Sequence, residues 1–319
     1  MPQPAADRPV IVILTGCTAS GKSGLAHRLA LDFGAEILSV DSMKVYREMD
    51  IGTAKPSLAE RRAAPHHLID VVDPSESFSA ARFVELADRA VADVHRRGRL
   101  TVADGGTILY LRTFTEGLFE GPASDPAIRQ RLREEADALG LEVLHDRLRH
   151  ADPQAADRIH RNDLKRILRA LEVHELTGRP ISSLQQQFGQ LRDDYRMLFV
   201  GLSHDRECLN RRINARVRQM MAQGFLDEAE RLFRREPPLS EQARQALGYA
   251  ELFAHLAGRC DLETAVEKIK INTRRFAKSQ RTWFRRMPHI EWFSVADDQE
   301  PLSRLDPIKR RIEVFLKEP

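Results

Sequence analysis

The chain has 319 residues, enough for one large hydrophobic core or for one core with a smaller appended domain. Charged residues make up 30% and hydrophobic residues 42%, as in ordinary globular proteins, and the net charge of +3 neither requires nor excludes a polyanionic partner. The three cysteines, Cys17, Cys208 and Cys260, are far apart, which argues against a disulfide framework or a cysteine zinc site. The first apolar run, Val10–Leu14, is too short to cross a membrane, and no signal-peptide region precedes it. We therefore expect a reduced, soluble, cytoplasmic enzyme with no membrane partner.

Short apolar runs alternate with helical patterns in the first 115 residues. Buried strands are predicted at Val10–Thr15, Glu36–Val40, Leu68–Val72 and Leu100–Ala103. Helical spacing is seen from Leu25 to Phe33 and over Ser79–Arg97. Strands that alternate with helices predict βαβ units, so the fold class is α/β with a parallel sheet flanked by helices.

The pattern changes after residue 115, where glycines and prolines break it and no strand-like run follows for some seventy residues. Helices are predicted instead at Asp125–Leu139, Leu141–Arg149 and Asp163–Leu176. A last strand, Met197–Leu202, resumes the sheet, and Arg206–Met287 is again helical. We predict three segments along the chain: residues 1–115 as the first part of the α/β core, 116–195 as a helical insertion domain, and 196–319 as the completion of the core with basic C-terminal helices.

A glycine-rich loop lies between the first strand and the first helix. It fits the pattern G-x-x-x-x-G-K-[ST] with Gly16, Cys17, Thr18, Ala19, Ser20, Gly21, Lys22 and Ser23. The glycines allow backbone N–H groups to surround phosphate oxygens, Lys22 adds positive charge, and the Ser23 hydroxyl can bind Mg²⁺. The loop predicts a P-loop NTPase-like core that binds a diphosphate or triphosphate, but it does not identify the reaction.

Asp41 ends the second predicted strand, so it should share the phosphate-loop edge of the sheet. The stretch from Asp41 to Pro56, together with the loop, closely resembles the tRNA dimethylallyltransferases, also called tRNA isopentenyltransferases. Further matches follow in the expected order over nearly the whole chain: Gly105-Gly106-Thr107 with Leu109-Tyr110, Ser124-Asp125-Pro126, Ile159-His160, Asn162-Asp163, Arg169–Val173, Leu247-Gly248-Tyr249, Thr273-Arg274, and Ala277-Lys278 with Gln280, Thr282 and Trp283.

The resemblance implies transfer of a dimethylallyl group from dimethylallyl diphosphate to N6 of an adenosine in the tRNA anticodon loop. That adenosine lies on the 3′ side of the anticodon in tRNAs that read codons starting with U. The family consumes no ATP: the eight loop residues and Arg216 would bind the diphosphate, with Mg²⁺ on Ser23. The implied partners are a tRNA and dimethylallyl diphosphate, and we expect a monomer.

Three residues take catalytic roles by the same resemblance. Asp41 would accept a proton from the adenine amine, and Thr107 would orient the adenine. Arg216, in the stretch Arg212-Ile213-x-x-Arg216, would contact the diphosphate. Each residue has a simpler alternative: Asp41 as a helix cap or a metal-shell carboxylate, Thr107 as a turn cap, and Arg216 as part of a solvated basic face.

A basic segment near the C-terminus predicts contact with a phosphate backbone. Residues 268–286 contain eight lysines and arginines and no acidic residue. On a helix, five of them form one stripe, and a solvated face is the alternative: Lys270, Arg274, Lys278, Arg281 and Arg285. An apolar seam is expected on roughly the opposite side: Ile269, Phe276, Trp283 and Met287. With the resemblance added, the predicted tRNA-binding residues are Asp41, Ser42, Met43, Lys44, Thr107, Arg129, Lys165, Arg166, Ile167, Leu168, Arg169, Gly248, Tyr249, Arg274, Lys278 and Arg281.

Two positions depart from the family pattern. Cys17 stands where proline is usual, which predicts a less rigid loop and a reactive thiol. Asp104 stands where an apolar residue is expected, and after a buried strand it resembles the Walker B aspartate that holds a metal shell. The adjacent His66 and His67 are interpreted as structural, since neighbours on a strand point to opposite faces.

Three functions remain open from the residues alone. Besides transfer to tRNA, they are transfer to a free adenine nucleotide and phosphoryl transfer by a small-molecule P-loop kinase, which Asp104 favours. A nucleic-acid-binding module would leave the phosphate loop without a use. The helical insertion and the basic helix favour tRNA, because a free nucleotide requires neither.

Overall fold

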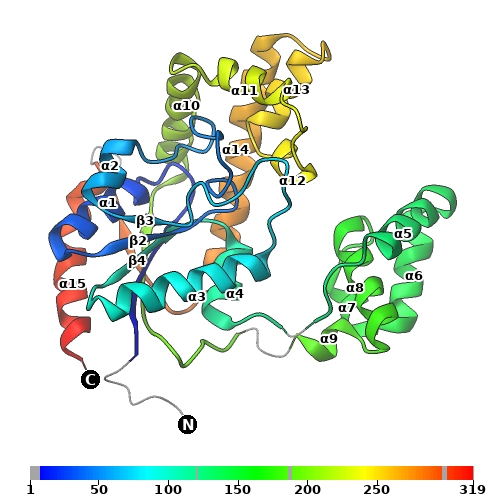
Figure 1. The fold of residues 1–319 in the computed structure, drawn as a ribbon, viewed down its shortest axis with the longest axis horizontal. Helices are drawn as coiled ribbons and strands as arrows, with labels where there is room; N and C mark the ends of the chain where they lie inside the picture. Colours follow the sequence, from blue (N-terminus) through cyan, green and yellow to red (C-terminus); the bar gives the residue numbers. More distant parts are fainter. Residues whose placement is uncertain (1–7, 120, 186–188, 297–299, 319) are drawn as a thin grey trace. The chain divides into compact units, whose positions relative to one another are not determined.

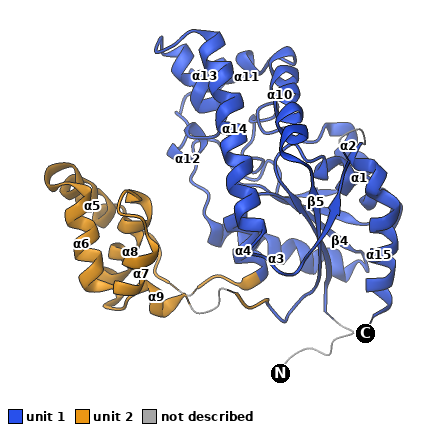
Figure 2. Cartoon of the chain, turned by 180° about the vertical axis from the view of Figure 1, so that it is seen from behind, with its two compact units in different colours: residues 1–115, 192–319 blue, residues 116–191 orange. Residues whose placement is uncertain are grey.

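The structure is a computed structural model that describes residues 8–119, 121–185, 189–296 and 300–318. It divides into two compact units, which are described separately (Figure 2). The first unit combines residues 1–115 with residues 192–319, and the second contains residues 116–191.

The first unit is built on a six-stranded sheet in the order β3-β2-β4-β1-β5-β6, in which every pair of neighbours is parallel (Figure 1). Its strands are β1 (Val10–Gly16), β2 (Glu36–Val40), β3 (His66–His67), β4 (Thr101–Gly105), β5 (Arg196–Ser203) and β6 (Ile290–Ser294). Every residue of β2 and β4 is buried, so helices cover both faces of the central sheet. The predicted α/β fold with a parallel sheet flanked by helices is confirmed.

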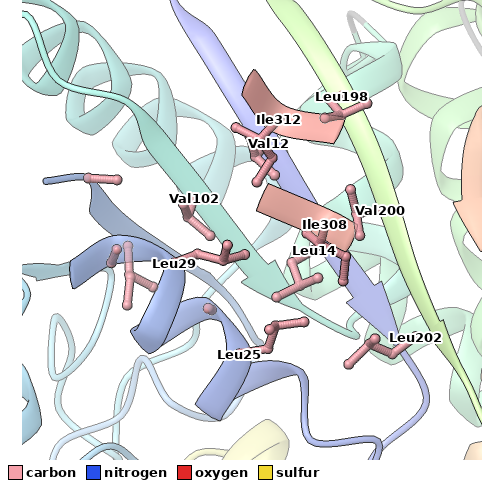
Figure 3. Packing of buried hydrophobic residues seen from close by; sticks show 14 of the residues in the cluster. Val12, Leu14, Leu25, Leu29, Val102, Leu198, Val200, Leu202, Ile308 and Ile312 are labelled. Carbon is pink, nitrogen blue, oxygen red and sulfur yellow. The ribbon is translucent and has the colours of Figure 1, made fainter. Parts of the chain in front are cut away.

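The helices of this unit pack around the sheet and complete its core. Their bounds are α1 (Lys22–Phe33), α2 (Leu58–Ala63), α3 (Ala80–Arg96), α4 (Ile108–Glu116, ending one residue into the second unit), α10 (Arg206–Ala222), α11 (Phe225–Phe233), α12 (Glu241–Arg244), α13 (Tyr249–Leu256), α14 (Leu262–Phe284), η2 (Pro301–Arg304) and α15 (Leu305–Lys317). Figure 3 shows side chains of α1 and α15, including Leu25, Leu29, Ile308 and Ile312, against those of β1, β4 and β5. Burial of this seam fixes α1, and therefore the loop that precedes it, on the sheet.

The prediction of a strand at Leu68–Val72 is wrong. The third strand is His66–His67, and Leu68 (φ 61°) and Asp70 (φ 58°) both have left-handed backbone conformations, which a strand does not accommodate. The Asp70 carboxylate accepts hydrogen bonds from Lys55 Nζ and Arg61 Nη1, each at 2.5 Å, and these bonds hold the turn.

The predicted last strand is followed by one more, β6, which pairs with β5 at the edge of the sheet. Its residues alternate between more and less buried positions, whereas every residue of the inner strands β2 and β4 is buried. The structural interpretation of the histidine pair agrees with the hydrogen bonds, since His66 contacts the Ala64 carbonyl and His67 contacts Glu36.

The second unit is helical and has its own core. It contains α5 (Pro126–Leu139), α6 (Leu141–Ala151), α7 (Pro153–Arg158), α8 (Leu164–Thr177) and α9 (Ile181–Leu184). The three long helices are the predicted ones, whereas α7 and α9 are too short to show helical periodicity. Residues 192–195 belong to the first unit, not to the insertion as predicted, and Arg192 there binds Asp88. No helix among the described residues of either unit is long and apolar enough to cross a membrane.

Candidate active site

The glycine-rich loop connects β1 to α1, as its pattern predicts. Gly16 is the last residue of β1, and a Cβ there would lie 2.8 Å from the Leu202 carbonyl oxygen, too close for any other residue. Gly21 has φ 88°, a left-handed conformation that lets the chain turn into α1. The loop therefore directs its N–H groups and the N-terminus of α1 to one place, which suits an anion.

Charged side chains from four elements gather beside this loop. Burial lowers the pKa of Lys22, Asp104 and Asp41 oppose that change, and Lys44 and Arg216 reinforce it. Burial likewise lowers the pKa of Arg216, against the opposing effect of Asp41 and Asp104. These mutual effects place three cations and two carboxylates within electrostatic reach of one another. The excess of positive charge makes this a site for a polyphosphate.

Asp41 follows β2 and begins a tight turn. Its Oδ1 accepts the backbone N–H groups of Met43 at 2.8 Å and of Lys44 at 3.2 Å. Its other oxygen, Oδ2, has no hydrogen bond within the described ranges, so it is available to a substrate. Asp41 is followed by a turn and not by a helix, so its Oδ1 caps a turn, while Oδ2 leaves the base and metal-shell roles open.

Thr107 lies next to this turn. Its hydroxyl accepts the backbone N–H of Ser42 at 3.0 Å and is 3.4 Å from the Ser42 hydroxyl. The contact joins the turn after β2 to the glycine pair after β4. Thr107 therefore holds the two strand ends together, and it faces the same edge of the sheet as Asp41.

Gln280 is a site residue to which the sequence analysis gave no role, although it is part of the family match. It lies on α14 and is 2% exposed, and its amide oxygen accepts the Thr18 N–H while its amide nitrogen donates to the Gly106 carbonyl, both at 2.8 Å. A Cβ at position 106 would lie 2.5 Å from that nitrogen, so the glycine permits the contact. One sequence signal could have found it: Gln280 is a polar residue three positions after Ala277 and four before Phe284, so it falls on the buried face of α14.

Cys17 lies beside the same helix. Its Sγ donates to the Ala277 carbonyl at 3.4 Å, and burial raises the pKa of the thiol. A raised pKa means less thiolate, so the expectation of a reactive thiol is not supported.

The basic segment forms α14, but its apolar seam differs from the prediction. Phe276 is 44% exposed, and Trp283 is half-buried between Arg112 and Arg286. The buried face combines two large apolar residues with small and polar ones, and it packs against α10, α13 and the phosphate loop: Ala265, Ile269, Thr273, Ala277, Gln280 and Phe284.

A pocket of 220 Å³ lies between α10 and α14. Five of its lining residues are cationic: Arg206, Arg274, Arg275, Lys278 and Arg281. Arg274 donates to Asn214 at 2.7 Å, and within the described ranges no acidic side chain pairs with Lys278 or Arg281. Unpaired cations in a concave surface are suited to a phosphate group.

Gly248 and Tyr249, both predicted to bind tRNA, are buried. The Tyr249 hydroxyl donates to Glu228 at 2.6 Å, and burial beside this carboxylate raises the pKa of Tyr249 far above its ordinary value. Glu228 also accepts the successive backbone N–H groups of residues 50–52. These residues fix the loop after the Asp41 turn from inside the protein.

In the second unit, the residues of α8 that were predicted to bind tRNA are partly exposed and partly buried. Lys165 and Arg166 are exposed, whereas Ile167 and Leu168 are part of the unit's core. Arg169 lies on the same helix, half-buried at its edge.

Arg129 and Arg169 both bind the fully buried Glu172. The Arg129 guanidinium donates two hydrogen bonds at 2.9 Å, and Arg169 adds one at 2.7 Å. Because Glu172 holds both guanidinium groups, it determines where they can meet a ligand.

Comparison with known proteins extends these observations. The family model described as IPP transferase matches residues 44–287. The tRNA dimethylallyltransferase of Geobacter metallireducens is 50% identical over 88% of this chain and 91% of its own length. A solved tRNA isopentenylpyrophosphate transferase from Bacillus halodurans has a TM-score of 0.72 and 39% identity, covering 97% of both chains. A solved eukaryotic dimethylallyltransferase acting on tRNA has a TM-score of 0.78 and 30% identity, covering 97% of this chain and 80% of that one.

Proposed function

This chain belongs to the IPP transferase family, and on that premise we propose that it transfers the dimethylallyl group of dimethylallyl diphosphate to a tRNA. The acceptor is N6 of the adenosine on the 3′ side of the anticodon, in tRNAs that read codons starting with U, and the second product is diphosphate. The observation that best supports this reaction is that Asp41 lies within electrostatic reach of Lys22 and Arg216 beside the phosphate loop. A proton acceptor and a diphosphate site are the two parts that the transfer needs.

The loop and its cations would hold the leaving diphosphate. As the bond between the prenyl carbon and the diphosphate oxygen breaks, negative charge grows on the leaving group. Loop N–H groups, Lys22 and Arg216 stabilise that charge in place, which is typically the largest contribution to such catalysis. Both side chains are partly withdrawn from water, so their charges act more strongly than on the surface.

A divalent metal fits this site, and we propose Mg²⁺ on the Ser23 hydroxyl. Ser23 lines the same small pocket as Asp104, whose buried Oδ1 has no hydrogen-bond partner. When bound, the ion would neutralise part of the charge on the diphosphate.

Asp41 would act as the base. The adenine amine is a poor nucleophile, because its lone pair is delocalised into the ring. The free Oδ2 of Asp41 would accept its proton as the new bond to carbon forms, while the turn N–H groups hold Oδ1 in place. Thr107, joined to Ser42, would place the adenine beside this carboxylate.

Two surfaces would bind the tRNA. The pocket between α10 and α14 offers Arg274, Lys278 and Arg281 to the phosphate backbone. In the second unit, Lys165 and Arg166 are exposed for direct contact, and Arg129 and Arg169 would reach the anticodon loop from their positions on Glu172.

The buried residues predicted to bind tRNA would act indirectly. Ile167 and Leu168 would support α8, and Gly248 and Tyr249 would support the loop of residues 50–52, which follows the turn that contains Ser42, Met43 and Lys44. We propose that the enzyme acts in the cytoplasm, on the tRNA found there, and that it acts as a monomer.

The test separates three activities in one experiment. Purified protein with Mg²⁺ and labelled dimethylallyl diphosphate is incubated with tRNA or with AMP, in parallel reactions with and without ATP. We expect label only in tRNA, and none in a tRNA whose target adenosine is replaced by guanosine. Label in AMP would identify a free-nucleotide transferase, and a strict need for ATP with release of ADP would identify a kinase.

A further inference from the structure

Asp104 is a buried carboxylate without a local partner. It lies near the end of β4, where it is paired in register with Leu14 of β1 and Ser39 of β2, and it is 6% exposed. Its Oδ1 is shielded from water and has no hydrogen-bond partner, and no cation of the described residues lies within ion-pair distance. Burial of a carboxylate oxygen without such a partner is unfavourable, so a ligand that supplies one would be favoured.

Asp104 lines a pocket of 110 Å³ that borders the phosphate loop. Ser39 Oγ and His27 Nδ1, two further buried atoms without a hydrogen-bond partner, belong to residues that line the same pocket. Ser39 and Asp104 are side by side in the sheet register and point to the same face. Ser23, at the start of α1, also lines the pocket. Polar side chains from α1, β2 and β4 therefore converge on this pocket, and the buried atoms of Asp104, Ser39 and His27 there have no hydrogen-bond partner.

The chemistry of this pocket suits a hydrated divalent cation. Mg²⁺ and Mn²⁺ prefer oxygen ligands, and Mg²⁺ typically keeps several waters while binding one or two carboxylates. A polar cavity of this size has room for several waters, which could in turn bond Ser39 and His27. Two lysines also line the pocket, Lys44, which is buried, and Lys55. Lys55 is already bound to Asp50 and Asp70, Lys22 is directed toward Gly106, and among the described residues neither Lys44 nor Lys22 forms an ion pair with Asp104.

We infer that Asp104 gives this chain a carboxylate of its own for a divalent cation, shared with the Ser23 hydroxyl and with water. The cation then binds the protein before the diphosphate donor arrives. The inference rests on the proposed function only in that the donor's diphosphate meets the cation at this edge of the sheet.

The experiment measures binding of Mn²⁺ to the protein alone by electron paramagnetic resonance, in which bound Mn²⁺ loses the signal of the free ion. We expect one site per chain, weakened at least about tenfold in Asp104→Asn and in Asp104→Ala, since each removes a full negative charge from the ion's surroundings. The matched control is Glu60→Gln, which removes a carboxylate from the same pocket wall. Glu60 is exposed to solvent and engaged by Ser57, so water screens its charge and Mn²⁺ affinity should fall by much less than in the Asp104 variants.

A second measurement, the melting temperature with and without Mn²⁺, shows whether each variant is folded and whether the ion stabilises it. Mn²⁺ should raise the melting temperature of the unaltered protein and of Glu60→Gln, but not of Asp104→Asn or Asp104→Ala. Equal Mn²⁺ affinity in all four proteins, an equal rise in melting temperature, or no binding to the unaltered protein would each overturn the inference. Prenyl transfer to tRNA is assayed separately, so its absence with intact Mn²⁺ binding would count against the proposed function and not against this site.

Discussion

Replacement of Gln280 by alanine tests whether the buried amide holds the site together. The side chain joins the Thr18 N–H of the phosphate loop to the Gly106 carbonyl after β4, at 2.8 Å on each side. Its loss leaves the buried Gly106 carbonyl unsatisfied, at a cost of about 1–3 kcal/mol. Thr18 is half-buried, so water can reach its N–H and its share is smaller. With the cavity left by the side chain, we expect a loss of about 2–4 kcal/mol in the free energy of unfolding of the first unit.

The assay is urea unfolding followed by tryptophan fluorescence. Both tryptophans of the chain, Trp283 and Trp292, lie in the first unit, so the signal reports on the unit that contains Gln280. The matched control is Ser279→Ala, an exposed neighbour on the same helix, which should change stability by less than about 0.5 kcal/mol. A midpoint for Gln280→Ala that coincides with the control, at unchanged slope, would refute the reasoning.

Gln280→Glu separates stability from substrate binding. Glutamate keeps the volume and the acceptor for Thr18 N–H, but it cannot donate to Gly106 and it brings a negative charge to the phosphate loop. The KM for dimethylallyl diphosphate should therefore rise by a larger factor in Gln280→Glu than in Gln280→Ala, which lacks the added charge. An unchanged KM would mean that position 280 does not influence the diphosphate site.

Three further predictions concern the proposed reaction. Lys22→Ala should lower turnover by roughly 100-fold or more while tRNA binding persists, and near-normal turnover would show that the loop does not hold the diphosphate. Asp41→Asn should keep the fold and both substrates, because an amide oxygen can accept the same turn N–H groups, but single-turnover rates should fall about 10²- to 10⁴-fold. A rate within about threefold of the unaltered protein, across a range of Mg²⁺, would remove Asp41 from the base role. Lys278→Glu with Arg281→Glu should weaken tRNA binding and reduce its log–log salt slope by about 0.7–0.9 per lost contact, and an unchanged slope would make α14 a solvated face.

The parts of the fold that follow from local pattern could be predicted. Continuous apolar runs gave the inner strands β1, β2 and β4, since both faces of these strands are buried. The segment 68–72 has a similar composition but forms a turn instead of a strand. The turn is stabilised by ion pairs of the Asp70 carboxylate with Lys55 and Arg61. Those partners are distant enough in sequence that no local pattern reports them. The edge strand β6 was missed for the opposite reason, because its exposed positions interrupt the apolar run.

The roles of the buried polar residues around the site could not be predicted from local pattern either. The loop motif and Asp41 could be found because their chemistry is local: a turn, a strand end and a helix start. Tyr249 and Arg129 were predicted to bind tRNA from the resemblance to the family. In the structure Tyr249 donates a hydrogen bond to the buried Glu228 and Arg129 to the buried Glu172, and no sequence spacing predicts either pair. A motif therefore indicates that a residue serves the site without telling whether it touches the ligand or holds a residue that does. That distinction depends on contacts across 21 positions in the first case and 43 in the second, and only the folded chain supplies them.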